Sequence, residues 1–153
     1  MGSDVKIDGL REALEGILRE RVKGAATKIA DELTKFAEHS ILGFYDHYQP
    51  VKYRRQGGLR GSYVRYYRNP HNKIYYGGVE IQPGSGTYTS RSGLSVSSEW
   101  ITALAVFNGM HGNVEAFPRI PKTVPPRMTP PPFELIEKKR DEVIGNIDSY
   151  ING

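Results

Sequence analysis

The chain has 153 residues, of which 38% are hydrophobic, with 17 glycines, 10 prolines and no cysteine. This length suits one domain with a real core, and we expect a single α+β domain over residues 1–153. The missing cysteines exclude disulfides, thiolate metal sites and cysteine nucleophiles. No stretch approaches the roughly 20 apolar residues that span a bilayer, and the first residues do not read as a signal peptide, so we expect no membrane contact.

The net charge of +4 is unevenly spread along the chain. Residues 1–50 carry seven Lys and Arg against nine Asp and Glu, and residues 94–153 carry six against seven. Residues 51–93 carry eight against one, Glu80. The basic excess therefore lies in the middle third of the chain.

Residues 8–48 have the apolar period of one long helix. Asp8 is a suitable N-cap, and Pro50 forces an end. Such a helix is about 60 Å long, whereas a domain of this size is about 30–35 Å across. Two alternatives follow: part of the apolar stripe leaves the domain and packs on another chain, or the helix bends inside the domain at Gly24 or Gly43. The stripe consists of Leu10, Leu14, Ile17, Val22, Ala25, Ile29, Leu33, Phe36, Ile41, Phe44 and Tyr48.

Residues 51–97 have the composition of a β-sheet region. Residues 63–68 and 74–81 are rich in β-forming side chains, and the turn-forming residues 69–72 between them predict an antiparallel hairpin. A further strand is expected to start near Tyr53, and another over residues 93–97. The Gly/Ser/Thr-rich residues 83–93 are expected to be a mobile loop.

The remaining segments are expected to be a helix, an arm and a closing helix. Ser97 or Ser98 caps a helix over residues 98–108, which glycines close. Seven prolines lie between Phe117 and Phe133, so residues 117–132 predict an extended arm that crosses a surface. Residues 133–150 predict a C-terminal helix.

No motif for catalysis or for a cofactor is present. The histidines at positions 39, 47, 71 and 111 have no metal-binding spacing, and the glycine-rich segments lack the order of a phosphate-binding loop. A lone carboxylate in the basic third cannot supply paired acid–base chemistry. We therefore expect no enzyme, no catalytic residue, no metal and no cofactor.

Arginine and tyrosine alternate along the predicted hairpin. This combination is typical of platforms that neutralise phosphates and stack the bases of single-stranded nucleic acid. Equally, the tyrosines can face the core while the arginines face water or an acidic protein partner. The candidate nucleic-acid contacts are Arg60, Arg65, Arg68 and Lys73.

Two segments carry a resemblance to a known family. The run from Phe44 to Arg55, FYDHYQPVKYRR, is followed by Gly58-Leu59, and the later run from Phe107 to Gly112 reads FNGMHG. In this order, with a proline-bearing arm and a last helix after them, they resemble the tail-completion or minor tail proteins at the neck of long-tailed bacteriophages and prophages. The usual Thr after the first Arg is Arg55 here.

The resemblance implies a structural virion protein at the neck, assembled in the host cytoplasm. It implies a homo-oligomeric ring, hexameric, between head-closure or connector proteins and the tail tube. The basic third then faces an acidic neighbour or, if it lines the bore, passing double-stranded DNA. A nucleic-acid-binding protein using the hairpin is the alternative. The candidate interface residues are Phe44, Tyr45, Tyr48, Tyr53, Arg54, Arg55, Arg65, Arg68, Pro125, Pro126, Pro130 and Pro131.

Overall fold

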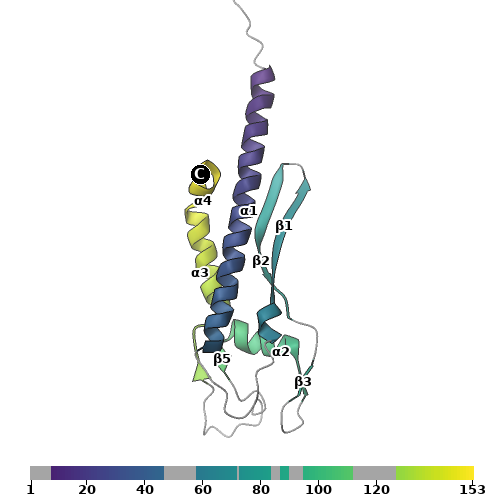
Figure 1. Ribbon diagram of the computed structural model, residues 1–153, viewed down its shortest axis with the longest axis vertical. Coiled ribbons are helices and arrows are strands. Elements are labelled where there is room, and N and C mark those ends of the chain that lie inside the picture. The colour runs from purple at the N-terminus through teal and green to yellow at the C-terminus, as the bar shows by residue number, and fades with distance from the viewer. Residues whose placement is uncertain (1–7, 47–57, 72, 84–86, 90–94, 112–126) are drawn as a thin grey trace, which may run out of the picture.

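The computed structural model describes residues 8–46, 58–71, 73–83, 87–89, 95–111 and 127–153 and has an α+β fold (Figure 1). Its central element is α1, Asp8–Asp46, a helix of 39 residues. At 1.5 Å per residue it is about 58 Å long. The hairpin of β1 and β2 lies along one side of its C-terminal half, and α3 with α4 lies along the other (Figure 1).

The two halves of α1 differ in packing. From Ala25 onward the helix is covered, with Ala30 and Ala37 fully buried. These small side chains let neighbouring elements approach the helix axis closely. No other described element covers residues 9–24, which are exposed throughout. The apolar stripe therefore extends beyond the packed part of the described chain, as the first of the two alternatives expects, and its packing on another chain stays a prediction.

The hairpin consists of β1, Tyr63–His71, and β2, Ile74–Ile81, paired antiparallel with Tyr63 opposite Ile81. It packs flat on α1 at Gly77, where a Cβ would collide with the backbone carbonyl of Ala26. The predicted turn at residues 69–72 lies two residues too early. Strand β1 continues through His71, with an irregularity in the pairing between Arg68 and His71 that accommodates the proline between them.

A second part of the molecule surrounds the C-terminal end of α1. Strand β3, Thr87–Thr89, pairs with β4, Ser95–Ser97, so the loop predicted over residues 83–93 contains a strand. Helix α2, Ser98–Thr102, begins with Ser97 as N-cap, whose hydroxyl accepts a bond from the Trp100 amide, as predicted. A π-helical turn, η2, Ala103–Phe107, follows, and Gly109 at φ +64° ends it.

The chain closes with a short ladder and two helices. Strands β5, Met110–His111, and β6, Arg127–Met128, pair antiparallel, so the predicted arm includes one strand. Helix α3, Pro132–Gly145, starts with proline in its first turn, as proline geometry favours. The predicted single helix 133–150 is interrupted at Asn146, and α4, Ile147–Asn152, follows.

The core lies where these parts meet at the C-terminal end of α1. Its buried members are Ile41, Phe44, Leu59, Ala105 and Val106. Tyr63, Ile81, Ile101 and Phe133 pack against them. A short 3₁₀ turn, η1, Gly58–Gly61, brings Leu59 into this cluster. The core therefore fixes one end of α1 and leaves the other end projecting (Figure 1).

Candidate interaction surface

The projecting half of α1 carries a row of exposed apolar side chains, which we call the exposed helix face. Exposed fractions of 36–60% are unusual for large aliphatic residues gathered on one helix. Their positions follow one another at steps of four, three, one and four residues, which at 100° per residue keeps them within about 140° of the helix circumference. Large exposed apolar patches are typical of surfaces that bind another protein, a membrane or a ligand. The members are Leu10 at 60%, Leu14 at 51%, Ile17 at 54%, Leu18 at 56% and Val22 at 36%.

Charged residues of both signs flank the exposed helix face. Arg11 Nε lies 3.2 Å from Glu15 Oε1, and Lys23 Nζ lies 3.6 Å from Glu20 Oε2. Both pairs are exposed and follow the helix repeat, so each adds only a few tenths of a kcal/mol to the helix. This half of α1 is therefore held by the helix itself and not by tertiary packing.

The hairpin has two different faces because side chains alternate along a strand. Tyr67 and Tyr75, whose rings lie 6.3 Å apart, belong to the same face as Gly77, which meets α1. The opposite face, which we call the outer hairpin face, is not covered by α1. Its members are Val64, Tyr66, Arg68, Tyr76 and Glu80, with Val64 and Tyr76 42% and 49% exposed.

Two arginines of the hairpin lie on these two faces in different settings. Arg65 Nε donates to Asp31 Oδ1 of α1 at 2.6 Å, so this cation serves to hold the hairpin on the helix. Arg68 lies on the outer face, with its guanidinium 5.7 Å from the centre of the Tyr66 ring and 3.9 Å from Glu80 Oε2. Its side chain is 71% exposed, so Arg68 is available to a partner.

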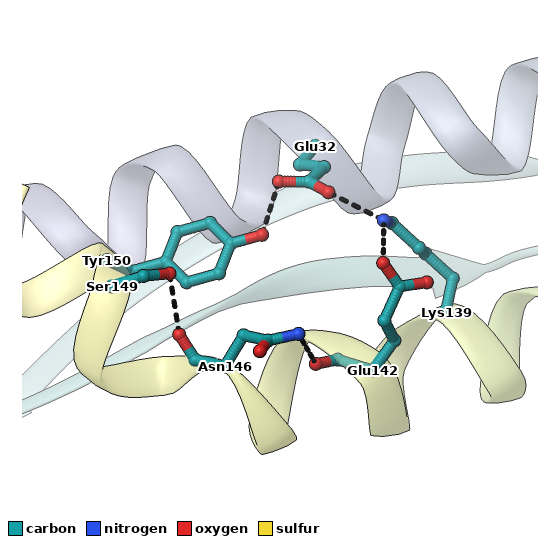
Figure 2. A network of polar contacts seen from close by, with 6 residues as sticks. All are labelled: Glu32, Lys139, Glu142, Asn146, Ser149 and Tyr150. Atoms are coloured by element: carbon teal, nitrogen blue, oxygen red, sulfur yellow. Dashed lines mark hydrogen bonds and ion pairs between the residues drawn. The ribbon is translucent and has the colours of Figure 1, made fainter.

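A polar network fastens the C-terminal helices to α1 (Figure 2). Glu32 Oε1 of α1 lies 2.8 Å from Lys139 Nζ of α3, and the Tyr150 hydroxyl of α4 donates to Glu32 Oε2 at 2.5 Å. Lys139 also contacts Glu142 Oε1 at 3.0 Å. One carboxylate thus holds both helices, and we call Glu32, Lys139, Glu142 and Tyr150 the helix clasp.

The helix clasp perturbs the groups that form it. The hydrogen bonds from Lys139 and then from Tyr150 lower the pKa of Glu32, because both stabilise the carboxylate. The same carboxylate raises the pKa of Lys139 and that of Tyr150. These shifts come from an ion pair and a hydrogen bond that join elements distant in the sequence, with the Glu32 side chain 38% exposed.

The predicted interface residues fall into three groups. Phe44 is 8% exposed and packs in the core, so it is not available to a partner. Arg65 is engaged with Asp31, whereas Arg68 and Lys73 are exposed on the hairpin and Pro130 is exposed before α3. Pro131 is partly buried at the start of α3. Tyr45 and Arg60 lie in described elements, but their side chains are outside the described part of the structure. The remaining residues lie outside the described ranges: Tyr48, Tyr53, Arg54, Arg55, Pro125 and Pro126.

Sequence reasoning missed the helix clasp and the role of Asp31. A visible signal was the adjacent pair Asp31-Glu32, two acids side by side in the covered half of a helix. Their directions on the helix differ by about 100°, so one reaches the hairpin and the other reaches α3 and α4. The sequence does not reveal which distant cations they meet.

The part of the chain that the structure describes contains no group of three or more His, Asp or Glu side chains placed to hold a metal ion. Over the same residues every buried side-chain polar atom has a hydrogen-bond partner. No helix among them has the length and apolar character to cross a membrane. The candidate functional features of the described residues are therefore two surfaces, the exposed helix face and the outer hairpin face.

Comparison with known proteins adds no assignment. The chain matches no protein-family model, no curated protein and no solved structure.

Proposed function

We propose that this protein is a structural virion subunit of the tail-completion or neck class, which forms a ring joining the head connector of a long-tailed phage to the tail tube. The observation that carries the proposal is the exposed helix face. Five large aliphatic side chains on one side of a projecting helix are the expected surface of a subunit that is completed by its neighbours. The resemblance of residues 44–59 and 107–112 to that family supplies the location.

A ring places a particular demand on its subunits. Each copy meets two neighbours through two different surfaces, because a head-to-tail contact joins unlike patches. The exposed helix face and the outer hairpin face are two such unlike surfaces. The first is aliphatic, and the second is aromatic and charged. The pairing of Arg65 with Asp31 joins the hairpin to α1, and the helix clasp joins α3 and α4 to it, both in the covered half of α1.

The experiment that tests the proposal is electron microscopy of particles from a producing strain that lacks this gene. Filled heads and finished tails lying apart are the expected result, because a neck subunit acts only when the two are joined. Joined particles in normal numbers, or no phage particles from the intact strain, would contradict the proposal.

Nucleic-acid binding is the second candidate, favoured by the cation–π pair of Arg68 and Tyr66 and by exposed Lys73. Against it, Arg65 is paired with Asp31, so among the described hairpin residues only Arg68 and Lys73 of the candidate contacts remain available to phosphates. A titration with single-stranded DNA separates the candidates. A binder that neutralises several phosphates loses affinity steeply as salt rises, whereas the neck subunit is expected to bind weakly at every salt concentration.

A further inference from the structure

The outer hairpin face is a sheet surface with aromatic side chains, and no helix or strand of the described residues covers it. Helix α1 meets the opposite face through Gly77. On the outer side Tyr66 and Tyr76 stand on neighbouring strands, and the Tyr66 ring lies over Gly78 at 3.0–3.1 Å from where a Cβ would be. Because Gly78 has no side chain, the row along β2 offers Tyr76, then the Tyr66 ring, then Glu80. This is an aromatic platform with a carboxylate at one end.

The carboxylate of this platform, Glu80, is held only weakly by its ion-pair partner. Glu80 lies 3.9 Å from Arg68, at the limit of an ion pair, and both side chains are strongly exposed, at 47% and 71%. An exposed pair of this kind contributes between zero and about 1 kcal/mol. A cation from another chain can therefore replace Arg68 at little cost.

Aromatic platforms with a nearby acid are how proteins recognise proline-rich segments, since prolines in an extended helix stack on tyrosine rings and a flanking cation pairs with the acid. This chain contains such a segment. Pro118-Arg119-Ile120-Pro121-Lys122 has two prolines three apart with a basic residue between them and another after them. It lies within residues 112–126, outside the described residues.

The two described residues that flank this segment lie together. His111 and Arg127, which flank residues 112–126, are paired across the ladder of β5 and β6, so the segment leaves and returns at one place. Half its length extended reaches about 20 Å from that ladder, and Pro118–Lys122 lies near its middle. In polyproline geometry those five residues span about 12 Å, close to the about 13 Å from Tyr76 to Glu80 along a strand.

We propose that Pro118–Lys122 of one copy docks on the outer hairpin face of a second copy, with its prolines against Tyr66 and Tyr76 and a basic side chain paired with Glu80. The proposal rests on the proposed ring, of which it names one contact: the proline segment and the hairpin face are unlike patches, so repetition gives the head-to-tail arrangement that closes a ring. The contact itself is measurable without phage particles.

The test uses a variant in which residues 112–126 are replaced by Asn-Gly, because the paired His111 and Arg127 can be joined by a two-residue turn. A synthetic peptide of residues 112–131 is titrated onto this variant and followed by amide NMR shifts. Expected are shifts centred on the outer hairpin face and at least a tenfold loss of affinity in Tyr76→Ala/Glu80→Gln. Ile144→Ala, which trims an apolar residue 57% exposed on α3, should bind as before.

Three outcomes would overturn the proposal. The first is no shift on the outer hairpin face at millimolar peptide, including the case where single-stranded DNA shifts this face and the peptide does not. The second is equal affinity for a peptide with Pro118→Ala/Pro121→Ala. The third is that the intact chain shows the same shifts on its outer hairpin face at every protein concentration, which would mean that the segment binds within its own chain. Separated heads and tails in the gene-deletion experiment would leave each of these results unchanged, so the two proposals fail separately.

Discussion

At the residue scale, two glycines test different effects on stability: Gly77 tests close packing, and Gly16 tests the conformational freedom of the backbone. Gly77 lies against the helix backbone, and an added Cβ would collide with the Ala26 carbonyl, which has little room to shift. We expect Gly77→Ala to lower the free energy of unfolding by about 1–3 kcal/mol. Gly16→Ala, in the projecting helix with nothing within 4 Å, should raise helix stability by up to about 1 kcal/mol. Urea denaturation and circular dichroism measure both, and an unchanged Gly77→Ala protein would contradict the packing.

The helix clasp predicts a pH dependence of stability at both ends of the scale. The pKa of Glu32 is lower in the folded chain than its ordinary 4.5, so its contribution is complete above that pH and is lost as pH falls through the folded value. The pKa of Tyr150 is raised above 10.0, so its contribution is present below that pH and is lost as pH rises through the folded value.

Glu32→Gln is therefore expected to be less stable than the natural chain at pH 7, by about 1 kcal/mol or less because the carboxylate is over a third exposed. The difference should shrink as pH falls below 4.5. Thermal unfolding from pH 3 to pH 8 measures it. Glu12→Gln, on the projecting half of α1, is the matched control and should follow the natural chain. A difference that stays constant with pH would exclude Glu32 as a charged anchor.

At the element scale, the two halves of α1 should differ in local stability. Residues 9–24 lack tertiary cover, and an isolated helix of this length is marginal in water, whereas residues 25–44 are packed on both sides. We expect amide hydrogens of Leu14 to Val22 to exchange at least tenfold faster than those of Ala30 to Ile41. Hydrogen exchange with mass spectrometry tests this, and equal protection in the monomer would show that the projecting half is already covered.

The elements differ in how well the sequence predicts them, for physical reasons. Helix α1, the hairpin and the Ser97 cap follow from local signals: an apolar period, β-forming runs and a capping hydroxyl. Strand β3 does not, because its residues pair with β4 across a segment without apolar alternation. The interruption between α3 and α4 at Asn146 was also not predicted, because no proline stands there to mark the end of a helix. The length of the apolar stripe predicted an exposed apolar surface on the helix. Phe44, a candidate interface residue, is buried instead, because segments distant in the sequence pack around it.

At the scale of the whole molecule, one end is a closed core and the other an open helix (Figure 1). The core at the C-terminal end of α1 needs no partner, since Ile41 and Val106 are almost fully buried within one chain. The exposed helix face leaves its aliphatic surface in water, and burying that surface on a partner would be favourable. We therefore propose a folded subunit that is completed on assembly, with the exposed helix face as the part that assembly buries.

The most direct measurement is complementation of the gene-deletion strain with Leu14→Gln/Leu18→Gln, followed by electron microscopy. Both side chains are more than half exposed, so the variant should fold with an unchanged free energy of unfolding of its core. We predict that the natural gene and the Ile144→Gln control restore joined particles, while the double variant leaves heads and tails apart. Joined particles in equal numbers from the double variant would contradict assembly through the exposed helix face.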